Sequence, residues 1–459
     1  MLGTNPYLNR QPINHPNEFF GRTQDVRWLL ERILHPVVPQ CCSITGLRRI
    51  GKTSLLRFLE HEEGAKRLYP DYFRLTDKLL LVYVDLSRDS LGVDKDNEAL
   101  TLATLRHILR SLARNARKQV NKEIATEIAA QRRAGGNTWQ GVLEALDECL
   151  LLLSENRFRV IFMLDEMDVA TAWHPRLAQA LRALVMEYNV AYITASLKPL
   201  FELLEEGRTS PFYNLFSTHP LGLLEQKDAR TLLTEPAREQ GLTWSRKLSE
   251  QLLEATGGHP DLVKRAGSHL WDLFKIKGCQ PEINTVLQAL TPDAYALFTS
   301  MWDHLSDKER SVVAKIAVGQ QTHATDVSTI LPALQHCAIL LDSTQGTELF
   351  GQLFHHWVKE QGPENHIQNE PRLEGRWLCL NKRKIQLTPT EVKLTRALLH
   401  RRGETVSREE LQDAVWKNGL SNDSKALDTS IQRLRGKIEL DRNNPKWLIT
   451  VRGEGYLFR

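Results

Sequence analysis

GLRRIGKT, residues 46–53, is the stretch that decides the fold of this 459-residue chain. It matches GxxxxGK[ST] at every fixed position and stands between a short apolar run and a helical one, the context that a phosphate-binding loop requires. The glycines let backbone N–H groups close around a phosphate, and the following helix adds positive potential. We expect Lys52 to reach the β- and γ-phosphates and the Thr53 hydroxyl to bind Mg²⁺. The expected nucleotide contacts in this loop are Gly46, Arg48, Arg49, Ile50, Gly51, Lys52, Thr53 and Ser54.

A second motif supplies carboxylates. The apolar run Phe162-Met163-Leu164 ends in Asp165 and Glu166. We expect Asp165 to hold Mg²⁺ and Glu166 to polarise the attacking water, so that Lys52, Asp165 and Glu166 form the candidate catalytic set. Asp168 is either a supporting ligand or a helix N-cap, and the sequence does not choose between them.

The strands around these motifs indicate a parallel sheet. Apolar runs at 43–45, 79–86, 159–164 and 190–195 alternate with helical segments, a pattern typical of strands buried on both faces. Ser196 ends the last run, where a small polar side chain could sense the γ-phosphate. The basic segment 99–133 is predicted to be helical, with a solvated charged face.

The following residues are predicted to be mostly helical. Residues 201–285 show no convincing strand, and 286–360 give helices followed by a hairpin with arms at 338–341 and 349–358 around Gly346. This order predicts a helical lid and then a small winged helix. The polar segment 361–374 holds two prolines and is expected to be a linker.

The overall composition is that of an ordinary globular protein. Hydrophobic residues make up 41% and charged residues 25% of the chain, and the length predicts about three domains. No apolar run approaches the ~18–20 residues of a membrane span, so no membrane partner is expected. The first 17 residues lack the apolar region of a secretion signal. The six cysteines form no CxxC pair, which excludes an obvious zinc site and favours a reducing, cytoplasmic location.

Positive charge is concentrated at one end. Residues 373–459 hold 18 Lys and Arg against 11 Asp and Glu, a net charge of +7, whereas the other 372 residues have a net charge of −3. Such a basic module favours a nucleic-acid contact confined to that end. On charge alone, a basic surface that binds nothing specific is an equal alternative.

This basic module has the element order of a winged helix-turn-helix. Two short strands precede a helix that opens at Thr388 with Glu391 at its N3 position, and a second helix is capped by Ser407. A third helix, expected over 424–440, carries an apolar stripe at helical spacing. A final hairpin follows, so the third helix can enter the major groove of DNA and the hairpin can lie on an adjacent groove.

The first 360 residues resemble a known family. FFGR (19–22), the phosphate loop, FMLDEMD (162–168), AYITAS (191–196) and GGHP (257–260) together resemble the STAND ATPases, a signal-transducing branch of the AAA+ superfamily. The resemblance implies binding of ATP or ADP, with Arg22, His259 and Pro260 as further nucleotide contacts. We also expect nucleotide to control self-association, so that the chain forms nucleotide-dependent homo-oligomers. Glu166 departs from many STAND proteins, which have a small residue there, and leaves open whether hydrolysis is slow or steady.

Residues 375–459 are similar to the OmpR-type effector domain of response regulators. The similarity is carried by the ordered string IQLTPTEVKLTRALL, VSREELQDAVW, ALDTSIQRLRGKIE and ITVRGEGYLF. It implies binding of double-stranded DNA by the third helix and the wing. The implied DNA contacts are Lys425, Thr429, Ser430, Gln432, Arg433 and, from the wing, Arg452. The sequence contains no phosphoacceptor receiver domain, so phosphorylation is not the expected input.

The fold class expected is therefore multidomain. An α/β P-loop NTPase core with a parallel sheet (1–200) is followed by a helical lid (201–285), a first winged helix (286–360), a linker (361–374) and an α+β winged helix-turn-helix (375–459). We interpret the chain as an ATP-dependent switch that regulates transcription. One alternative is a DNA-remodelling, mobile-element or phage-defence ATPase that assembles on DNA. Another is a protein-interaction ATPase whose tail binds a partner or effector.

Overall fold

In the computed structural model the chain divides into two units, Met1–Trp357 and Val358–Arg459. Described are all residues except 1–2, 10, 75–77, 89–96, 204–211, 321–323, 344–345, 362–370, 381–382, 402–404, 417–423, 440–444, 446, 452–453 and 459.

A five-stranded sheet forms the centre of the first unit. Its strands are β1 (Cys41–Thr45), β2 (Leu79–Asp85), β3 (Arg159–Asp165), β4 (Val190–Ser196) and β5 (Phe216–Pro220). They run parallel in the order β2-β3-β4-β1-β5, and every residue of β1, β3 and β4 is buried. The parallel sheet predicted from the apolar runs is confirmed. The carboxyl ends of β1, β3 and β4 meet at one edge, where the phosphate loop and the acidic motif lie together.

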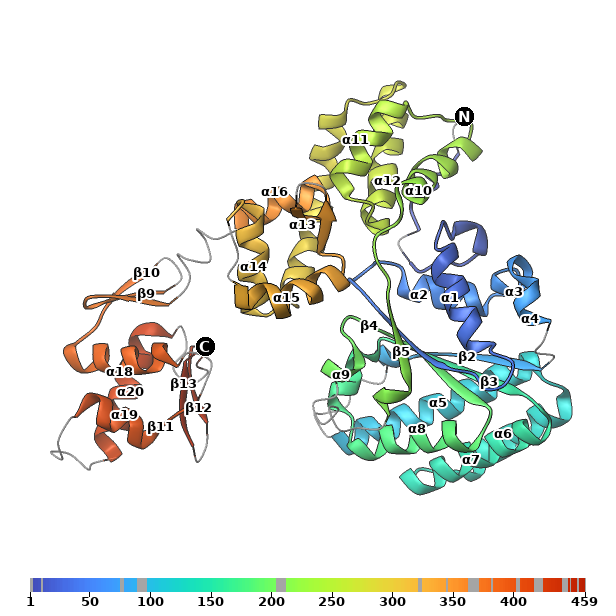
Figure 1. The fold of residues 1–459 in the computed structure, drawn as a ribbon, viewed down its shortest axis with the longest axis horizontal. Helices are drawn as coiled ribbons and strands as arrows, with labels where there is room; N and C mark the ends of the chain where they lie inside the picture. The colour runs from blue at the N-terminus through green and yellow to red at the C-terminus, as the bar shows by residue number, and fades with distance from the viewer. Residues whose placement is uncertain are drawn as a thin grey trace. The chain divides into compact units, whose positions relative to one another are not determined.

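Helices cover the two faces of this sheet (Figure 1). The helices of one side are α1 (Thr23–Ile33), α2 (Lys52–Glu60), α3 (Ala65–Leu68) and α4 (Pro70–Phe73). Those of the other side are α5 (Asn97–Gln119), α6 (Lys122–Ala134), α7 (Trp139–Glu155) and α8 (Pro175–Glu187). The predicted helical segment 99–133 is two helices, because the Asn121 side chain accepts a bond from the Ile124 N–H and caps a new start.

Strand β5 corrects one expectation. Residues 201–285 were expected to hold helices alone, yet Phe216–Pro220 pairs with β1 as an edge strand, after the short helix α9 (Leu200–Leu203). Its sequence, FSTHP, has neither a continuous apolar run nor a clean alternation, because none of its residues is fully buried. Such a strand gives no hydrophobic signal.

Three helices form the lid: α10 (Gln226–Glu239), α11 (Arg246–Thr256) and α12 (Pro260–Lys277). Their shared core also takes in Tyr7 from the N-terminal segment. The Tyr7 hydroxyl donates to the Leu233 carbonyl at 2.5 Å, and its ring fills the space that a side chain at Gly267 would need. The N-terminal segment is thus built into the lid.

The first winged helix follows directly. It comprises α13 (Ile283–Trp302), α14 (Asp307–Ala317), α15 (Ala324–His336), β6 (Leu340–Ser343), β7 (Gly346–Leu349) and α16 (Gln352–Gln361). The expected second hairpin arm over 349–358 is wrong in part, since strand β7 ends at Leu349 and a helix takes over. Phe350, Phe354 and Trp357 recur at helical spacing and are all buried, which favours a helix over an extended strand.

The second unit has its own hydrophobic core. Its elements are β8 (Arg372–Glu374), β9 (Trp377–Leu380), β10 (Arg383–Gln386), α18 (Pro389–His400), β11 (Thr405–Ser407), α19 (Arg408–Val415), α20 (Ser424–Ile438), β12 (Leu448–Val451) and β13 (Gly455–Phe458). Both capping boxes are present, Thr388 with Glu391 and Ser407 with Glu410. Strand β8 pairs with β9, so the expected linker contains ordered backbone at its C-terminal end.

No helix in the described parts of the chain is long and apolar enough to cross a bilayer.

Candidate functional site

The loop between β1 and α2 has a backbone that depends on its glycines. Gly46 has φ 151°, and a Cβ there would lie 2.6 Å from the Leu221 carbonyl oxygen. Gly51, at φ 107°, is the N-cap of α2, and Arg49 also has a positive φ of 58°. Non-glycine residues rarely adopt this conformation, and such strain gathers at functional sites.

Lys52 turns back onto this loop. Its ammonium donates to the carbonyl oxygens of Gly46 at 2.7 Å and Leu47 at 3.0 Å. Burial lowers the pKa of Lys52 to about 8, against the opposing effect of the carboxylates of Asp168 and Glu166. The side chain is a cation, held by neutral partners, at the start of a helix.

Asp165 lies at the end of β3 and is 2% exposed. One carboxylate oxygen accepts a hydrogen bond from the Tyr83 hydroxyl at 2.7 Å, and the other accepts from the Glu166 N–H at 3.0 Å. Asp165 has no ion-pair partner among the described residues. The guanidinium of Arg57, on α2, lies 3.6 Å from the centre of the Tyr83 ring. Tyr83 was not expected from the sequence, where it is one apolar residue in a strand.

Glu166 follows in the left-handed conformation, with φ 56°, and its side chain is exposed. Although the residue is exposed as a whole, its carboxyl group is partly desolvated, and this desolvation and the neighbouring Asp165 raise the pKa of Glu166. Asp168 is not a helix N-cap. It accepts from the Leu197 N–H with both oxygens, at 3.1 and 3.0 Å, and so ties the acidic motif to the end of β4. Beside it, the buried Ser196 hydroxyl donates to the Lys198 carbonyl at 2.7 Å.

Arg22 reaches the phosphate loop from the start of α1. It is 8% exposed, has φ 63°, and donates to the Ile50 carbonyl at 2.9 Å. Burial lowers its pKa, while Asp25, 3.7 Å away, opposes that effect. The other carboxylate oxygen of Asp25 lies 2.7 Å from Nε2 of His219 in strand β5.

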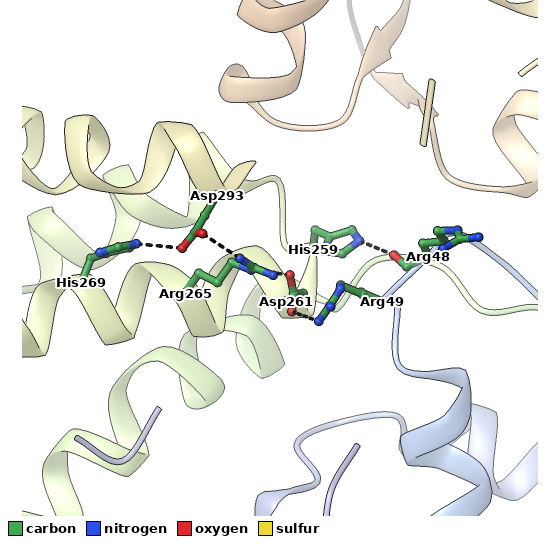
Figure 2. A network of polar contacts seen from close by, with 7 residues as sticks. All are labelled: Arg48, Arg49, His259, Asp261, Arg265, His269 and Asp293. Carbon is green, nitrogen blue, oxygen red and sulfur yellow. Dashed lines mark hydrogen bonds and ion pairs between the residues drawn. The ribbon is translucent and has the colours of Figure 1, made fainter. Parts of the chain in front are cut away.

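The lid contacts the same loop through His259. This residue is fully buried, and its Nε2 lies 3.2 Å from the Arg48 carbonyl oxygen (Figure 2). A carbonyl can only accept, so the ring is protonated at Nε2. Burial lowers the pKa of His259 to about 4, which keeps the ring neutral near pH 7. Pro260 then opens α12.

A chain of ion pairs continues from the loop into the lid and the first winged helix (Figure 2). Arg49 contacts Asp261 at 3.3 Å, Asp261 contacts Arg265 at 2.6 Å, and Arg265 contacts Asp293 of α13 at 3.0 Å. His269 also contacts Asp293, at 3.1 Å. Arg49 was expected only as a nucleotide contact, and the acidic and histidine partners of this chain were not expected from the sequence. The pairs Arg49–Asp261 and Arg265–Asp293 join residues that are far apart along the chain.

Two histidines of the winged helix also reach the phosphate loop and the end of β1. The Arg48 guanidinium donates to His304 Nε2 at 3.2 Å, and His336 Nε2 lies 3.0 Å from the Thr45 hydroxyl at the end of β1. The loop is therefore bonded to elements from all three parts of this unit.

The expected site residues largely share one cavity of about 650 Å³, within the usual range for ligand pockets. Those that line it are Arg22, Arg48, Arg49, Ile50, Gly51, Lys52, Thr53, Ser54, Glu166 and Pro260. Gly46, Asp165, Ser196 and His259 do not line it, although each contacts or adjoins a residue that does. Phe20, Leu224 and Leu232 add apolar surface at the lid side.

Five of the six candidate DNA contacts belong to α20 of the second unit. Thr429, Gln432 and Arg433 are exposed, whereas Ser430 is half-buried and donates to the Ala426 carbonyl at 2.9 Å. Arg452 and the side chain of Lys425 lie outside the described residues.

Two further basic residues of α20 are structural. Arg435 is 7% exposed and donates to the Leu448 carbonyl at 2.9 and 2.6 Å and to the Thr450 hydroxyl at 2.8 Å. Lys437 pairs with Glu391 at 2.6 Å. Part of the charge of this helix thus holds the fold together instead of facing solvent.

Comparisons with known proteins agree with this arrangement. A family model described as "Novel STAND NTPase 2" matches residues 39–322, and one described as "Transcriptional regulatory protein, C terminal" matches residues 382–458. The chain is 42% identical over 76 residues to the transcriptional regulatory protein AfsQ1 of Streptomyces coelicolor, covering 17% of this chain and 34% of AfsQ1. It is 39% identical over 104 residues to the sensory transduction protein RegX3 of Mycobacterium tuberculosis, covering 22% of this chain and 41% of RegX3.

The chain thus spans well under half the length of these curated relatives. Among solved structures, a Walker-type ATPase of Pyrococcus abyssi has a TM-score of 0.53 at 15% identity, covering 77% of this chain and 99% of the other. That likeness is one of fold.

Proposed function

The chain belongs to the family described as Novel STAND NTPase 2, and from this premise we propose that it is an ATP-hydrolysing molecular switch that binds DNA and regulates transcription. The observation that best supports a switch is that the phosphate loop bonds directly to the lid and to the first winged helix. A change in what the loop holds would therefore alter contacts of both.

In this proposal the cavity takes ATP or ADP. Lys52 leaves its two carbonyl partners for the β- and γ-phosphates, a stronger, charge-assisted interaction. Arg22, Arg48 and Arg49 add positive charge, and Pro260 and its apolar neighbours receive the base. Ser196, behind this surface at the end of β4, would sense the γ-phosphate.

The residues present also fit Mg²⁺. Asp165 is a buried carboxylate with two neutral hydrogen-bond donors and no ion pair to any residue that the structure describes, which favours a cation nearby. No group of three His, Cys, Asp or Glu in the described ranges could hold a metal by itself. Mg²⁺ typically binds through one or two carboxylates together with substrate phosphates. Thr53 and Asp165 would be its ligands, and bound Mg²⁺ would neutralise charge on the transferring phosphoryl group.

Glu166 is the proposed general base for water. It lines the cavity, is exposed, and has a raised pKa, each of which suits a carboxylate that polarises a nucleophile. Lys52, Asp165 and Glu166 then complete the catalytic set.

The switch would work through differential affinity. ATP and ADP can shift the balance between two arrangements of the unit only if each nucleotide binds the two arrangements with different affinity. The Arg49–Asp261 ion pair can create such a difference, because Arg49 can pair either with Asp261 or with a phosphate. A phosphate that draws Arg49 away from Asp261 weakens the tie to α12 and α13. We propose that the released arrangement self-associates and that DNA binding by the second unit is its output.

One experiment tests both halves of the proposal. ATP turnover and a DNA footprint are measured on the same preparation, with ATP, ADP or no nucleotide, for the parent chain and for Asp261→Asn. Nucleotide-dependent protection of one promoter-proximal site, shifted in the variant, supports a transcriptional switch. DNA-stimulated turnover with little sequence preference would instead support the remodelling or defence ATPase. Turnover without any DNA protection would support a protein-interaction ATPase.

A further inference from the structure

Asp165 is held in one orientation by a residue from a neighbouring strand. Of its two carboxylate oxygens, one is taken by the adjacent backbone N–H and the other by the Tyr83 hydroxyl at 2.7 Å. The backbone bond alone leaves the carboxylate plane free to rotate. The tyrosine bond fixes it.

The position of the tyrosine is itself set by its strand register and by Arg57. β2 pairs with β3 in parallel, with Tyr83 beside Met163, and this register sends the phenol toward Asp165 two residues on. Arg57 lies over the ring at 3.6 Å and is anchored by Glu60 at 2.9 Å. Arg57 belongs to α2, the helix that begins at Lys52.

We propose that Tyr83 is a positioning residue for Mg²⁺, which sets the orientation of Asp165 and couples it, through Arg57, to the helix that carries Lys52 and Thr53. This inference rests on the proposed function, because it assigns Asp165 to the metal. It adds a third element, β2, to a proposed metal site otherwise built from α2, which carries Thr53, and from β3, which carries Asp165. Residues that orient a metal ligand typically change metal affinity about 10–100-fold when removed.

Tyr83→Phe is the direct test, because it deletes one hydroxyl and keeps the ring beneath Arg57. The readout is binding of a fluorescent ATP analogue, titrated with Mg²⁺ and repeated in EDTA. We expect the Mg²⁺ concentration for half-maximal tightening to rise roughly tenfold, with binding in EDTA unchanged. Turnover at saturating Mg²⁺ should largely recover, which separates positioning from a direct catalytic role.

Tyr192→Phe is the matched control. Tyr192 is a fully buried tyrosine of the same sheet, and its hydroxyl donates to the Leu181 carbonyl at 3.1 Å, away from the acidic motif. It should lose a similar amount of stability without moving the Mg²⁺ midpoint. Arg57→Met, which keeps an apolar stem over the ring, should shift the midpoint in the same direction by less.

A double variant shows whether Tyr83 acts through Asp165. In an Asp165→Asn background, Tyr83→Phe should cause no further change in Mg²⁺-dependent binding. An unchanged Mg²⁺ midpoint in Tyr83→Phe, with a responsive parent chain, would overturn the role of Tyr83 alone. A parent chain whose nucleotide binding ignores Mg²⁺ would overturn the proposed function and this role together. If Tyr83→Phe does not fold, an unshifted Mg²⁺ midpoint in Arg57→Met overturns the positioning role.

Discussion

Lys52 and Glu166 have separable tasks at the scale of single residues. Lys52 is the cation at the start of α2, and Glu166 is a carboxylate at the cavity surface. We expect Lys52→Ala to weaken nucleotide binding roughly a hundredfold, the effect of losing ~3 kcal/mol of charge-assisted bonding.

Glu166→Gln should bind nucleotide normally, trap the ATP form and turn over about 10²–10⁴-fold more slowly. Equilibrium binding and single-turnover rates check both. Glu155→Gln, an exposed carboxylate on α7, is the control, and parent-like turnover in Glu166→Gln would remove Glu166 from the catalytic set.

The lowered pKa of Lys52 predicts a pH dependence of binding. In the free protein the ammonium loses its proton above about pH 8, and only the charged form attracts phosphate. Nucleotide affinity should therefore be level below pH 8 and fall about tenfold per pH unit above it. Binding above pH 8 should also take up a proton, which calorimetry in two buffers of different ionisation enthalpy will detect. Lys52→Arg should abolish this dependence, and a level affinity up to pH 10 would contradict the prediction.

At the scale of elements, the clearest features of the sequence were the local ones. The phosphate loop, the β3 carboxylates and the two capping boxes depend on neighbouring residues, so their spacing predicts them. Strand β5 was missed because its residues are polar and its pairing with β1 is what makes it a strand. The bonds of Asp165 to Tyr83 and of Arg435 to Leu448 join residues whose proximity only the fold creates. The division into five segments stays a prediction.

The exposed polar residues of α20 can contact DNA in two ways, through a phosphate or through a base edge. The two kinds of contact predict different effects of substitution on DNA binding. Arg433 is exposed and, if it neutralises one phosphate, Arg433→Ala should weaken every duplex alike and reduce the salt slope by about 0.9. If Gln432 reads a base edge, Gln432→Ala should cost roughly 1–3 kcal/mol on the preferred site only. Binding isotherms at several salt concentrations, on selected and scrambled duplexes, distinguish them. Arg396→Ala, an exposed arginine of α18, is the control.

Equal losses on both duplexes for every α20 variant would mean that this helix anchors the protein to DNA in general. Arg435→Ala belongs to a different class of variant. It removes three hydrogen bonds to β12, so we expect a loss of thermal stability before any change in DNA contacts.

At the scale of the whole molecule, the second unit should fold and bind DNA alone. It has its own core of buried side chains, and β8 completes its first sheet. A fragment beginning at Pro371 should give dispersed amide NMR signals and melt cooperatively. It should also retard a DNA duplex in an electrophoretic mobility-shift assay. A fragment beginning at Gly375 lacks β8 and the packing of Leu373, so it should melt at a lower temperature. Equal melting temperatures would show that β8 is dispensable, and a disordered longer fragment would refute autonomy.

The first unit depends on a joint made of bare backbone. Gly257 ends α11, and Gly351 precedes α16; a Cβ on Gly257 would lie 2.6 Å from the Gly351 nitrogen, and one on Gly351 would lie 2.7 Å from the Gly257 nitrogen. Both have positive φ, so each is needed for its conformation as well as for its size. Because the two backbones meet directly, no side chain at this joint can change rotamer to accommodate a relative movement. We therefore expect the lid and the first winged helix to move as one rigid body: if nucleotide rotates the lid, as the proposed switch requires, the first winged helix should turn with it about a single hinge.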